Sequence, residues 1–317
     1  MIPARLVKAA AAAVAVAAVV AAPYVLPSYV VSLLTLGFIA ALLAGSVNLL
    51  AGLAGLVSLG HAGLAAAGAY GVAWATVHGL PLPAALGVAG ALTLAVSVLY
   101  ALTTMRTSGI VFLMITLALG ITVFGLAVKL SSVTGGQNGL TGIRRPEPIG
   151  EWWQFYFFTA AVYGVCLLAM AAVARSPFGL TLRGVRESQS RMTSLGYSVR
   201  AVKFTAMVVS GGFAGLAGVL LAWNSEFVSP SAVSFSRSAL AVVMVIVGGT
   251  GTLLGPLVGA GVVVTAEYWL SSYLERWPTV LGVALILVVL FAPRGIVGGL
   301  EGLAGTLAQR PRRKEGS

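Results

Sequence analysis

The sequence contains no aspartate, because all eight of its acidic residues are glutamates. This absence excludes a phosphorylated aspartate, a Walker-B aspartate and a proton relay built on aspartate. None of the four lysines follows a glycine, so the chain also lacks the G-x-x-x-x-G-K-[ST] loop that holds nucleotide phosphates. If the protein moves a solute uphill with ATP, another chain must hydrolyse that ATP.

Cysteine and histidine are scarce as well. Cys166 is the single cysteine, and His61 and His78 are the two histidines. These numbers leave no disulfide framework and no cluster of metal ligands. Cys166 lies in an apolar run, which is typical of a small buried core residue. No pairing of a nucleophile with a base stands out, so we expect neither an enzyme nor a bound cofactor.

Apolar residues, in contrast, are abundant. They make up 59% of the 317 residues, only 9% are charged, and the mean hydropathy is +1.00. A soluble domain usually carries about a quarter charged residues. We therefore expect an all-α, polytopic membrane protein that forms a single transmembrane domain over 1–317. At about 20 apolar residues per spanning helix, hydropathy predicts ten spans, at 9–26, 29–50, 54–76, 84–104, 108–129, 153–174, 203–223, 238–250, 256–273 and 277–292.

The charge of the chain is strongly basic, with 19 Lys and Arg against 8 Glu. Basic residues of membrane proteins collect on the cytoplasmic side. With ten spans and a cytoplasmic N-terminus, fourteen of the 19 fall inside, including those of the basic tail at 294–317. This distribution predicts a multi-pass protein of the bacterial inner membrane with both termini in the cytoplasm, and it explains the charge by contact with membrane lipid rather than nucleic acid. The basic, then apolar start of the chain also fits a cleaved signal peptide, but a retained first helix is the preferred interpretation.

Two loops are candidates for contact with partners. The external loop 131–152 is rich in Gly, Ser, Asn and Pro, and its Gln137, Asn138 and Thr141 either contact another protein or cap a helix. The internal loop 175–202 is basic and predicts a short helix near 182–195, with Gly196 as its C-cap. That helix either lies solvated near anionic headgroups or docks into a partner.

Two glycine-rich regions, 45–71 and 248–261, interrupt the apolar spans. Spacings of four, as in Gly251, Gly255 and Gly259, predict small faces where membrane helices pack closely. The alternative is that broken or re-entrant helices in the two halves, related by an internal repeat, line a central path. The candidate path or break residues are Asn48, Ser58, Gly60, His61, Gly249, Gly251, Gly255 and Glu267, with Asn224 and Glu226 as further polar residues near span ends.

Two of the eight path or break candidates carry ionisable side chains. His61 lies between Gly60 and Gly63, where it either stabilises an interrupted helix by hydrogen bonds or forms part of a gate. Glu267 lies inside a predicted span, and such a residue is a functional candidate by default. Its alternative is structural pairing with Arg237 or Lys129.

Several segments together resemble the permease subunits of branched-chain amino acid ABC importers, and most closely the M-type member of the permease pair. The similarity runs from about residue 30 to 300, and the segments occur in the same order and spacing. They are GLVSLGHAGLAAAGAY (55–70), TGGQNGLTGI (134–143), RSPFGLTLRGVRES (175–188), LGYSVRAVKFTAMVVSGGFAGLAGVL (195–220) and VMVIVGGTGTLLGPLVGA (243–260).

The resemblance implies a machine of several chains. A second, related permease would pair with this one, two cytoplasmic ATPase subunits would hydrolyse the ATP, and a periplasmic binding protein would deliver leucine, isoleucine or valine. In the family the internal loop couples to the ATPases. This implies coupling positions at Glu187 and Gly196, with Phe178, Arg183 and Arg186 around them. The family loop usually carries alanines and a second acidic residue where this chain has Ser-Gln-Ser-Arg-Met at 188–192.

Two other functions remain open at this stage. The same class of importer also carries urea, short amides or other amino acids, because the binding protein does much of the selecting. An ion-coupled secondary transporter that works alone is a more remote alternative, because the chain has no aspartate and little charge within its spans.

Overall fold

The computed structural model describes residues 4–147, 149–274, 279–280, 282–283 and 295–299. The α-helices are α1 (Ala4–Val25), α2 (Ser28–Asn48), α3 (His61–Val77), α4 (Leu82–Thr104), α5 (Gly109–Lys129), α6 (Ser131–Thr134), α7 (Trp152–Arg175), α8 (Pro177–Glu187), α9 (Gln189–Ser194), α10 (Val199–Ser225), α11 (Phe235–Gly248) and α12 (Gly255–Ser271). Short elements are the π-helical turn η1 (Leu49–Ala54), the 3-10 turns η2 (Gly136–Asn138) and η3 (Pro230–Val233), and the strands β1 (Leu140–Thr141) and β2 (Phe227–Val228).

The protein is a polytopic, predominantly α-helical membrane protein. Five described helices are long and apolar enough to cross a membrane: Ser28–Ala54, Leu82–Thr104, Gly109–Lys129, Trp152–Arg175 and Val199–Ser225. Each of the first nine predicted spans coincides with one helix, although α11 is shorter than a full crossing at 14 residues. Most of the tenth predicted span, 277–292, and of the basic tail lies outside the described residues.

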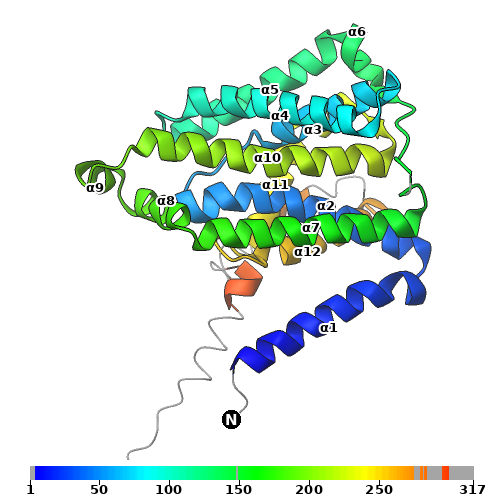
Figure 1. Cartoon of the computed structure of the whole chain (residues 1–317), viewed down its shortest axis with the longest axis horizontal. Helices are drawn as coiled ribbons and strands as arrows, with labels where there is room; N and C mark the ends of the chain where they lie inside the picture. Colours follow the sequence, from blue (N-terminus) through cyan, green and yellow to red (C-terminus); the bar gives the residue numbers. More distant parts are fainter. Residues whose placement is uncertain (1–3, 148, 275–278, 281, 284–294, 300–317) are drawn as a thin grey trace, which may run out of the picture.

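Helix α10 runs through the middle of the bundle, between α3 and α4 on one side and α2 on the other (Figure 1). Small residues allow this close approach, as the spacing predicts. A Cβ added to Gly218 would overlap the carbonyl oxygen of Ala65 in α3, and one added to Gly211 would overlap the Ser97 hydroxyl in α4. Membrane helices associate through such backbone contacts, since lipid supplies no hydrophobic drive between them.

The hairpin of α11 and α12 is packed in the same way. Cβ atoms added to Gly255 and Gly259 would meet the backbone of α11 at Gly249 and Met244. The prediction that Gly251 shares this helix face is wrong, because α12 begins only at Gly255. Gly251 lies in the connecting turn at φ +81°, a left-handed conformation that glycine adopts without strain.

The predicted third span does not begin as a helix. α2 continues through η1 to Ala54, residues 55–60 are non-helical, and α3 starts at His61. The helix therefore begins seven residues later than the predicted boundary at 54. Non-helical backbone within a membrane protein is tolerated where it is buried in protein that satisfies its polar groups.

The two loops of interest lie at opposite ends of the bundle (Figure 1). Helices α8 and α9 project at one end, and the α5–α7 connection, which includes α6, lies at the other. At this second end β1 pairs antiparallel with β2, with Leu140 opposite Val228 and Thr141 opposite Phe227. This pairing ties the connection to the segment between α10 and α11.

Candidate translocation cavity and coupling helix

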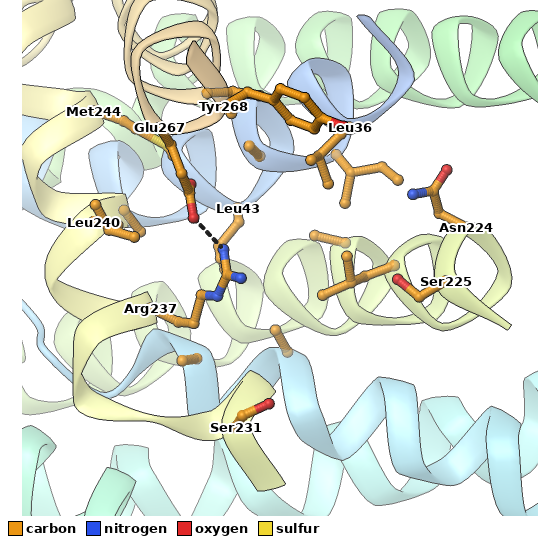
Figure 2. A pocket seen from close by; sticks show the side chains of 18 of the residues that line it. Leu36, Leu43, Asn224, Ser225, Ser231, Arg237, Leu240, Met244, Glu267 and Tyr268 are labelled. Atoms are coloured by element: carbon orange, nitrogen blue, oxygen red, sulfur yellow. Dashed lines mark hydrogen bonds and ion pairs between the residues drawn. The ribbon is translucent and has the colours of Figure 1, made fainter. Parts of the chain in front are cut away.

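A cavity of about 470 Å³ lies among α2, α3, α10, α11 and α12 (Figure 2). This volume lies within the ~300–1,000 Å³ of typical small-molecule sites. Its wall is mainly aliphatic, and includes Leu36, Ile39, Leu43, Leu221, Leu240 and Met244. Polar side chains come from the ends of the surrounding helices, and include Asn224, Ser225, Ser231, Tyr268 and Ser271.

An ion pair crosses this cavity. Nη1 of Arg237, in the first turn of α11, lies 3.4 Å from Oε1 of Glu267 near the end of α12 (Figure 2). The Arg237 side chain is 54% exposed and the Glu267 side chain 22% exposed, so both reach the open space. The expected pairing of Glu267 with Arg237 is thus confirmed. Sequence reasoning named Arg237 only as a possible partner of Glu267. The signal that could have singled it out is an arginine at the start of an apolar helix.

His61 is fully buried and hydrogen-bonded on both sides of its ring. Nδ1 lies 2.9 Å from Oγ of Ser58, and Nε2 lies 2.8 Å from Oγ of Ser210 in α10. The Ser210 hydroxyl donates its proton to the carbonyl oxygen of Ser46, so it accepts from Nε2–H. At Nδ1 the Ser58 hydroxyl can donate or accept, so it completes the hydrogen bonding of the ring. These bonds fasten the break to α10 and α2, and they support the structural interpretation of His61.

The start of α3 is also held by α11. Its first N–H groups have no partner within their own helix, as in every helix. Oγ of Ser238 accepts from the N–H of Ala62 over 3.1 Å, and the N–H of Gly63 bonds the carbonyl oxygen of Gly60. A Cβ on Gly60 would overlap the carbonyl oxygen of Thr116 in α5. The break is thus a packed and satisfied junction.

Asn48 fastens the end of α2 to the turn between α11 and α12. Its Nδ2 donates to the carbonyl oxygen of Thr252 over 2.9 Å, and its Oδ1 accepts from the N–H of Gly251 over 2.8 Å. The neighbouring Gly249 ends α11 at φ +120°. Sequence reasoning named Asn48, Gly249 and Gly251 as break or path candidates, and the structure places them together at the end of the bundle that carries α8.

Helix α8 packs on this junction. Leu182 and Val185 are buried, and Phe178 is half-buried against the core. One turn after Leu182, Nη1 of Arg186 donates to the carbonyl oxygen of Gly52, in η1, over 2.6 Å. A Cβ on Gly52 would lie only 2.7 Å from Cα of Gly251, so there is no room between η1 and the α11–α12 turn. Arg186, η1 and the turn therefore form one continuous contact.

The internal loop forms two helices rather than the single one predicted near 182–195. Ser188 has extended backbone and interrupts the helix, and its Oγ accepts from the N–H of Arg191 at the start of α9. Gly196, at φ +86°, ends α9, and the Tyr197 N–H bonds the Met192 carbonyl oxygen. This is a Schellman ending, so the predicted C-cap is confirmed.

The remaining loop candidates face outward. Glu187 is exposed at the end of α8, and Arg183 is exposed while donating to the Ala174 carbonyl oxygen over 3.3 Å. Leu180 and Leu195 are exposed as well, at 61% and 67%. The loop thus presents apolar and basic groups away from the bundle.

Lys203 is a residue that sequence reasoning did not single out. Its Nζ donates to the Thr107 carbonyl oxygen over 2.8 Å and to Oε1 of Gln189 over 2.9 Å. It therefore joins α9 to α10 and to the α4–α5 turn. A lysine at a span end reads as a topology signal in the sequence, so only the structure reveals this link.

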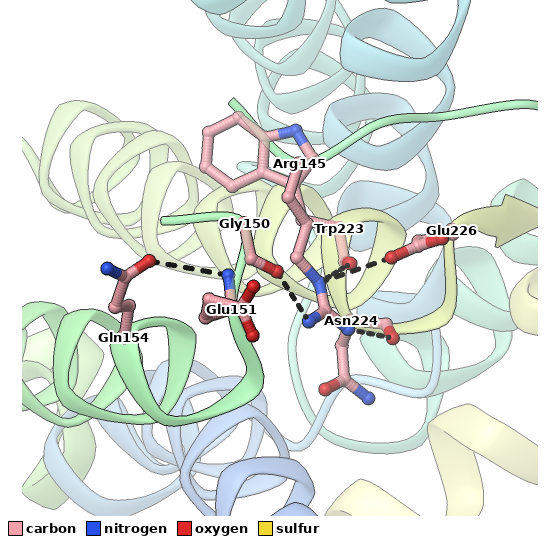
Figure 3. Close-up of polar contacts among 7 residues, drawn as sticks. All are labelled: Arg145, Gly150, Glu151, Gln154, Trp223, Asn224 and Glu226. Carbon is pink, nitrogen blue, oxygen red and sulfur yellow. Dashed lines mark hydrogen bonds and ion pairs between the residues drawn. The ribbon is translucent and has the colours of Figure 1, made fainter. Parts of the chain in front are cut away.

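Arg145 organises the opposite end (Figure 3). Nε donates to the Trp223 carbonyl oxygen over 2.9 Å and Nη2 to that of Asn224 over 3.2 Å, and the guanidinium lies 4.7 Å from the centroid of the Phe155 ring. Glu226, at φ +52°, lies 3.5 Å from Nε. Cationic groups stabilise the C-terminal carbonyls of a helix, here α10. The loop is thereby fixed beside the polar rim of the cavity.

The external candidates Gln137, Asn138 and Thr141 are exposed on this fixed loop. Asn138 ends η2, and Thr141 belongs to β1. Their exposure suits contact with another protein.

A bundle of apolar helices around an open cavity, with polar contacts that join an exposed basic helix to the cavity's own helices, defines a membrane transport permease. The family model for the permease component of branched-chain amino acid transport systems matches residues 29–292. The chain belongs to this family, and it is a transport protein rather than an enzyme.

Individual relatives agree. The high-affinity branched-chain amino acid transport system permease protein LivM of Escherichia coli K12 is 29% identical over 303 residues, covering 87% of this chain and 71% of that protein. LivH of Salmonella typhimurium is 26% identical over 197 residues, covering 57% and 64%. A probable LivM of Methanocaldococcus jannaschii is 23% identical over 183 residues, covering 50% and 52%. No solved structure matches the chain significantly.

Proposed function

We propose that the chain is one permease subunit of an ATP-driven importer that carries leucine, isoleucine and valine. The observation that carries this proposal is the contact of Arg186 in α8 with Gly52 in η1. It joins an exposed helix, which another protein can push, to the turn between the two helices that bear the cavity's ion pair. A force applied at α8 has a packed route to the cavity.

The partners follow from the division of labour. The chain has no phosphate-binding loop, so two ATPase subunits would bind α8 and α9, where Leu180, Leu195 and the arginines are exposed. A second permease of the LivH type would complete the path. A periplasmic binding protein would dock on the end that carries Gln137, Asn138 and Thr141. Phe178 would hold α8 against the bundle, and Glu187 would contact the ATPase.

The location we propose is the bacterial inner membrane, with both termini in the cytoplasm. Support comes from the position of the two loops at opposite ends of the bundle and from the excess of basic residues in the segments on the α8–α9 side. The ten-span count, the internal repeat and the single domain over 1–317 remain predictions.

The cargo is supported by the character of the cavity. Aliphatic walls suit the side chains of leucine, isoleucine and valine, whereas urea and short amides offer nothing to bury there. An ion-coupled transporter working alone is less well supported, because Arg237 and Glu267 are the two charged residues among those that line the cavity in the described part of the chain.

Deletion of the gene tests the proposal. Binding-protein-dependent leucine uptake should be lost in the deletion strain and restored by the intact chain. A variant with Arg183 and Arg191 changed to Glu should be inserted in the membrane but restore neither uptake nor co-purification of the ATPases. Unchanged uptake in the deletion strain, in a background without a second leucine system, would contradict the proposal.

A further inference from the structure

Within the proposed importer, on which this inference rests, we propose that Arg237 and Glu267 bind the charged head group of the amino acid in transit. Arg237 would take the α-carboxylate and Glu267 the α-ammonium group, with the side chain of the amino acid against the aliphatic wall. The pair would then be a site that the cargo opens and occupies.

The geometry of the pair is that of a contact made to be exchanged. A single contact of 3.4 Å joins Nη1 to Oε1, and among the described residues neither charged group makes a second hydrogen bond with its side chain. A guanidinium carries five N–H donors and binds a carboxylate best through two parallel bonds. Structural ion pairs within proteins are usually supported by further hydrogen bonds, because burial makes an unsupported charge costly.

The surroundings match an α-amino acid on both sides of the pair. Arg237 and Glu267 are the two charged residues among the described residues that line the cavity, and the adjoining wall includes Leu36, Leu43, Leu240 and Met244 (Figure 2). A zwitterion replaces one internal ion pair with two external ones, so no charge is left alone. A solute with one charge leaves Arg237 or Glu267 without a partner, and a neutral solute has to compete with the pair while offering nothing in its place.

The pair can therefore select the head group after the binding protein has released the cargo. A site built around charged hydrogen-bonding groups rejects an analogue that lacks the matching group far more strongly than an apolar pocket rejects a missing methylene. Selection at this point would add to the selectivity of the binding protein. Neutralising Arg237 would remove selection for the carboxylate, and neutralising Glu267 would remove selection for the ammonium group.

Ligand binding to the purified membrane complex, without the binding protein, tests this inference. The complex contains this chain, its partner permease and the ATPases. Saturation-transfer NMR would compare L-leucine with 3-methylbutylamine, which lacks the carboxylate, and with 4-methylpentanoate, which lacks the ammonium group. In the wild-type complex leucine should bind about tenfold or more tightly than either analogue.

Each single variant should lose one discrimination. Arg237→Gln should weaken leucine binding about tenfold and abolish the preference over 3-methylbutylamine, and Glu267→Gln should do the same for the preference over 4-methylpentanoate. Arg144→Gln and Glu147→Gln, which neutralise exposed charges of the external loop, are the matched controls and should change neither preference.

Stability is separated from recognition by a double variant. Arg237→Gln with Glu267→Gln leaves no charge unpaired, so it should assemble normally and still bind leucine weakly and without preference. Wild-type leucine binding in the double variant, or an equal loss for all three probes in the single variants, would overturn the inference. If the deletion strain loses uptake while these preferences persist in the variants, the importer assignment stands and only the head-group site fails.

Discussion

At the scale of residues, His61 shows how side-chain hydrogen bonds replace the missing backbone bonds where a helix is interrupted. Its imidazole, fully buried, joins Ser58 of the break to Ser210 of α10, and Ser210 continues to the Ser46 carbonyl oxygen of α2. Polar groups buried in a membrane protein need such partners, since lipid offers none. The histidine is therefore a cross-link among three parts of the bundle.

We predict that His61→Ala destabilises the protein. The substitution removes the hydrogen-bond partner of the Ser58 hydroxyl and leaves a cavity where the ring was. We expect this to lower the free energy of unfolding by about 1–3 kcal/mol. His61→Gln, which retains a donor and an acceptor, should lose less. Thermal unfolding in detergent measures both. Normal stability combined with abolished transport in His61→Ala would instead support a role in the path.

The same residues show what the sequence could predict. The sequence offered Arg237 or Lys129 as a partner for Glu267, and a hydrogen-bonded role as one of two for His61, because ionisable groups in spans usually have partners. The identities of Ser210 and Ser46 did not follow. They lie 149 and 164 positions from their partners in the chain. Nothing in the sequence distinguishes a serine that bonds another helix from one that only packs.

At the scale of elements, helix α8 and turn η1 connect the internal loop to the turn between α11 and α12. Arg186 bonds Gly52, Gly52 lies against Gly251, and Asn48 bonds both Gly251 and Thr252. The elements on this route are short and fixed by specific polar bonds. Within the proposed importer, we therefore expect a movement of α8 to reach the α11–α12 turn.

We predict that Arg186→Ala uncouples ATP hydrolysis from transport. Reconstituted importer should transport several-fold fewer leucine molecules per ATP, because the bond to Gly52 is lost while the buried face of α8 stays in place. Arg186→Lys should retain most of the coupling, since a single donor suffices for a single carbonyl. Arg106→Ala is the control, because Arg106 is an exposed arginine between α4 and α5 and lies outside α8 and η1. An unchanged ratio in Arg186→Ala would contradict this route.

The packing of α10 on α3 gives a prediction with a control on the same helix. Gly218→Ala places a Cβ in the Ala65 carbonyl oxygen, so the helices have to separate at a cost of about 1–3 kcal/mol. Gly212→Ala meets open space and should be neutral or slightly stabilising. Unfolding in detergent or bicelles measures the difference. Equal effects of the two substitutions would show that close contact of these helices is unimportant.

Elements were predicted better than their interruptions. Hydropathy located the helices, and the four-residue spacing of small residues located the packing faces of α10 and α12. The break before His61 was expected at Ser58, Gly60 and His61, but the start of the third span was placed too early, at 54, because hydropathy does not tell apolar non-helical residues from helical ones. The break at Ser188 was missed, because helix-forming composition does not show a local break. Gly251 was placed on a helix face for the same reason, as spacing alone does not tell a helix from a glycine turn.

At the scale of the whole molecule, the missing aspartate and phosphate loop and the structure point to the same division of labour. One end of the bundle presents α8 and α9, the other presents a loop that Arg145 holds in place, and a cavity with one ion pair lies near that second end. The charge of the chain predicted which loops share a side. Sequence could not predict the cavity, because its lining comes from five helices spread over more than 200 residues.

Reconstitution in proteoliposomes shows whether this chain transports leucine alone or only as part of an ATP-driven importer. Leucine uptake would be measured with the complete importer and with this chain alone, under an imposed proton or sodium gradient and with or without internal and external ATP. We predict uptake that requires the partner permease, the ATPases, the binding protein and ATP together. Gradient-driven leucine uptake by this chain alone, without ATPase subunits, would contradict it.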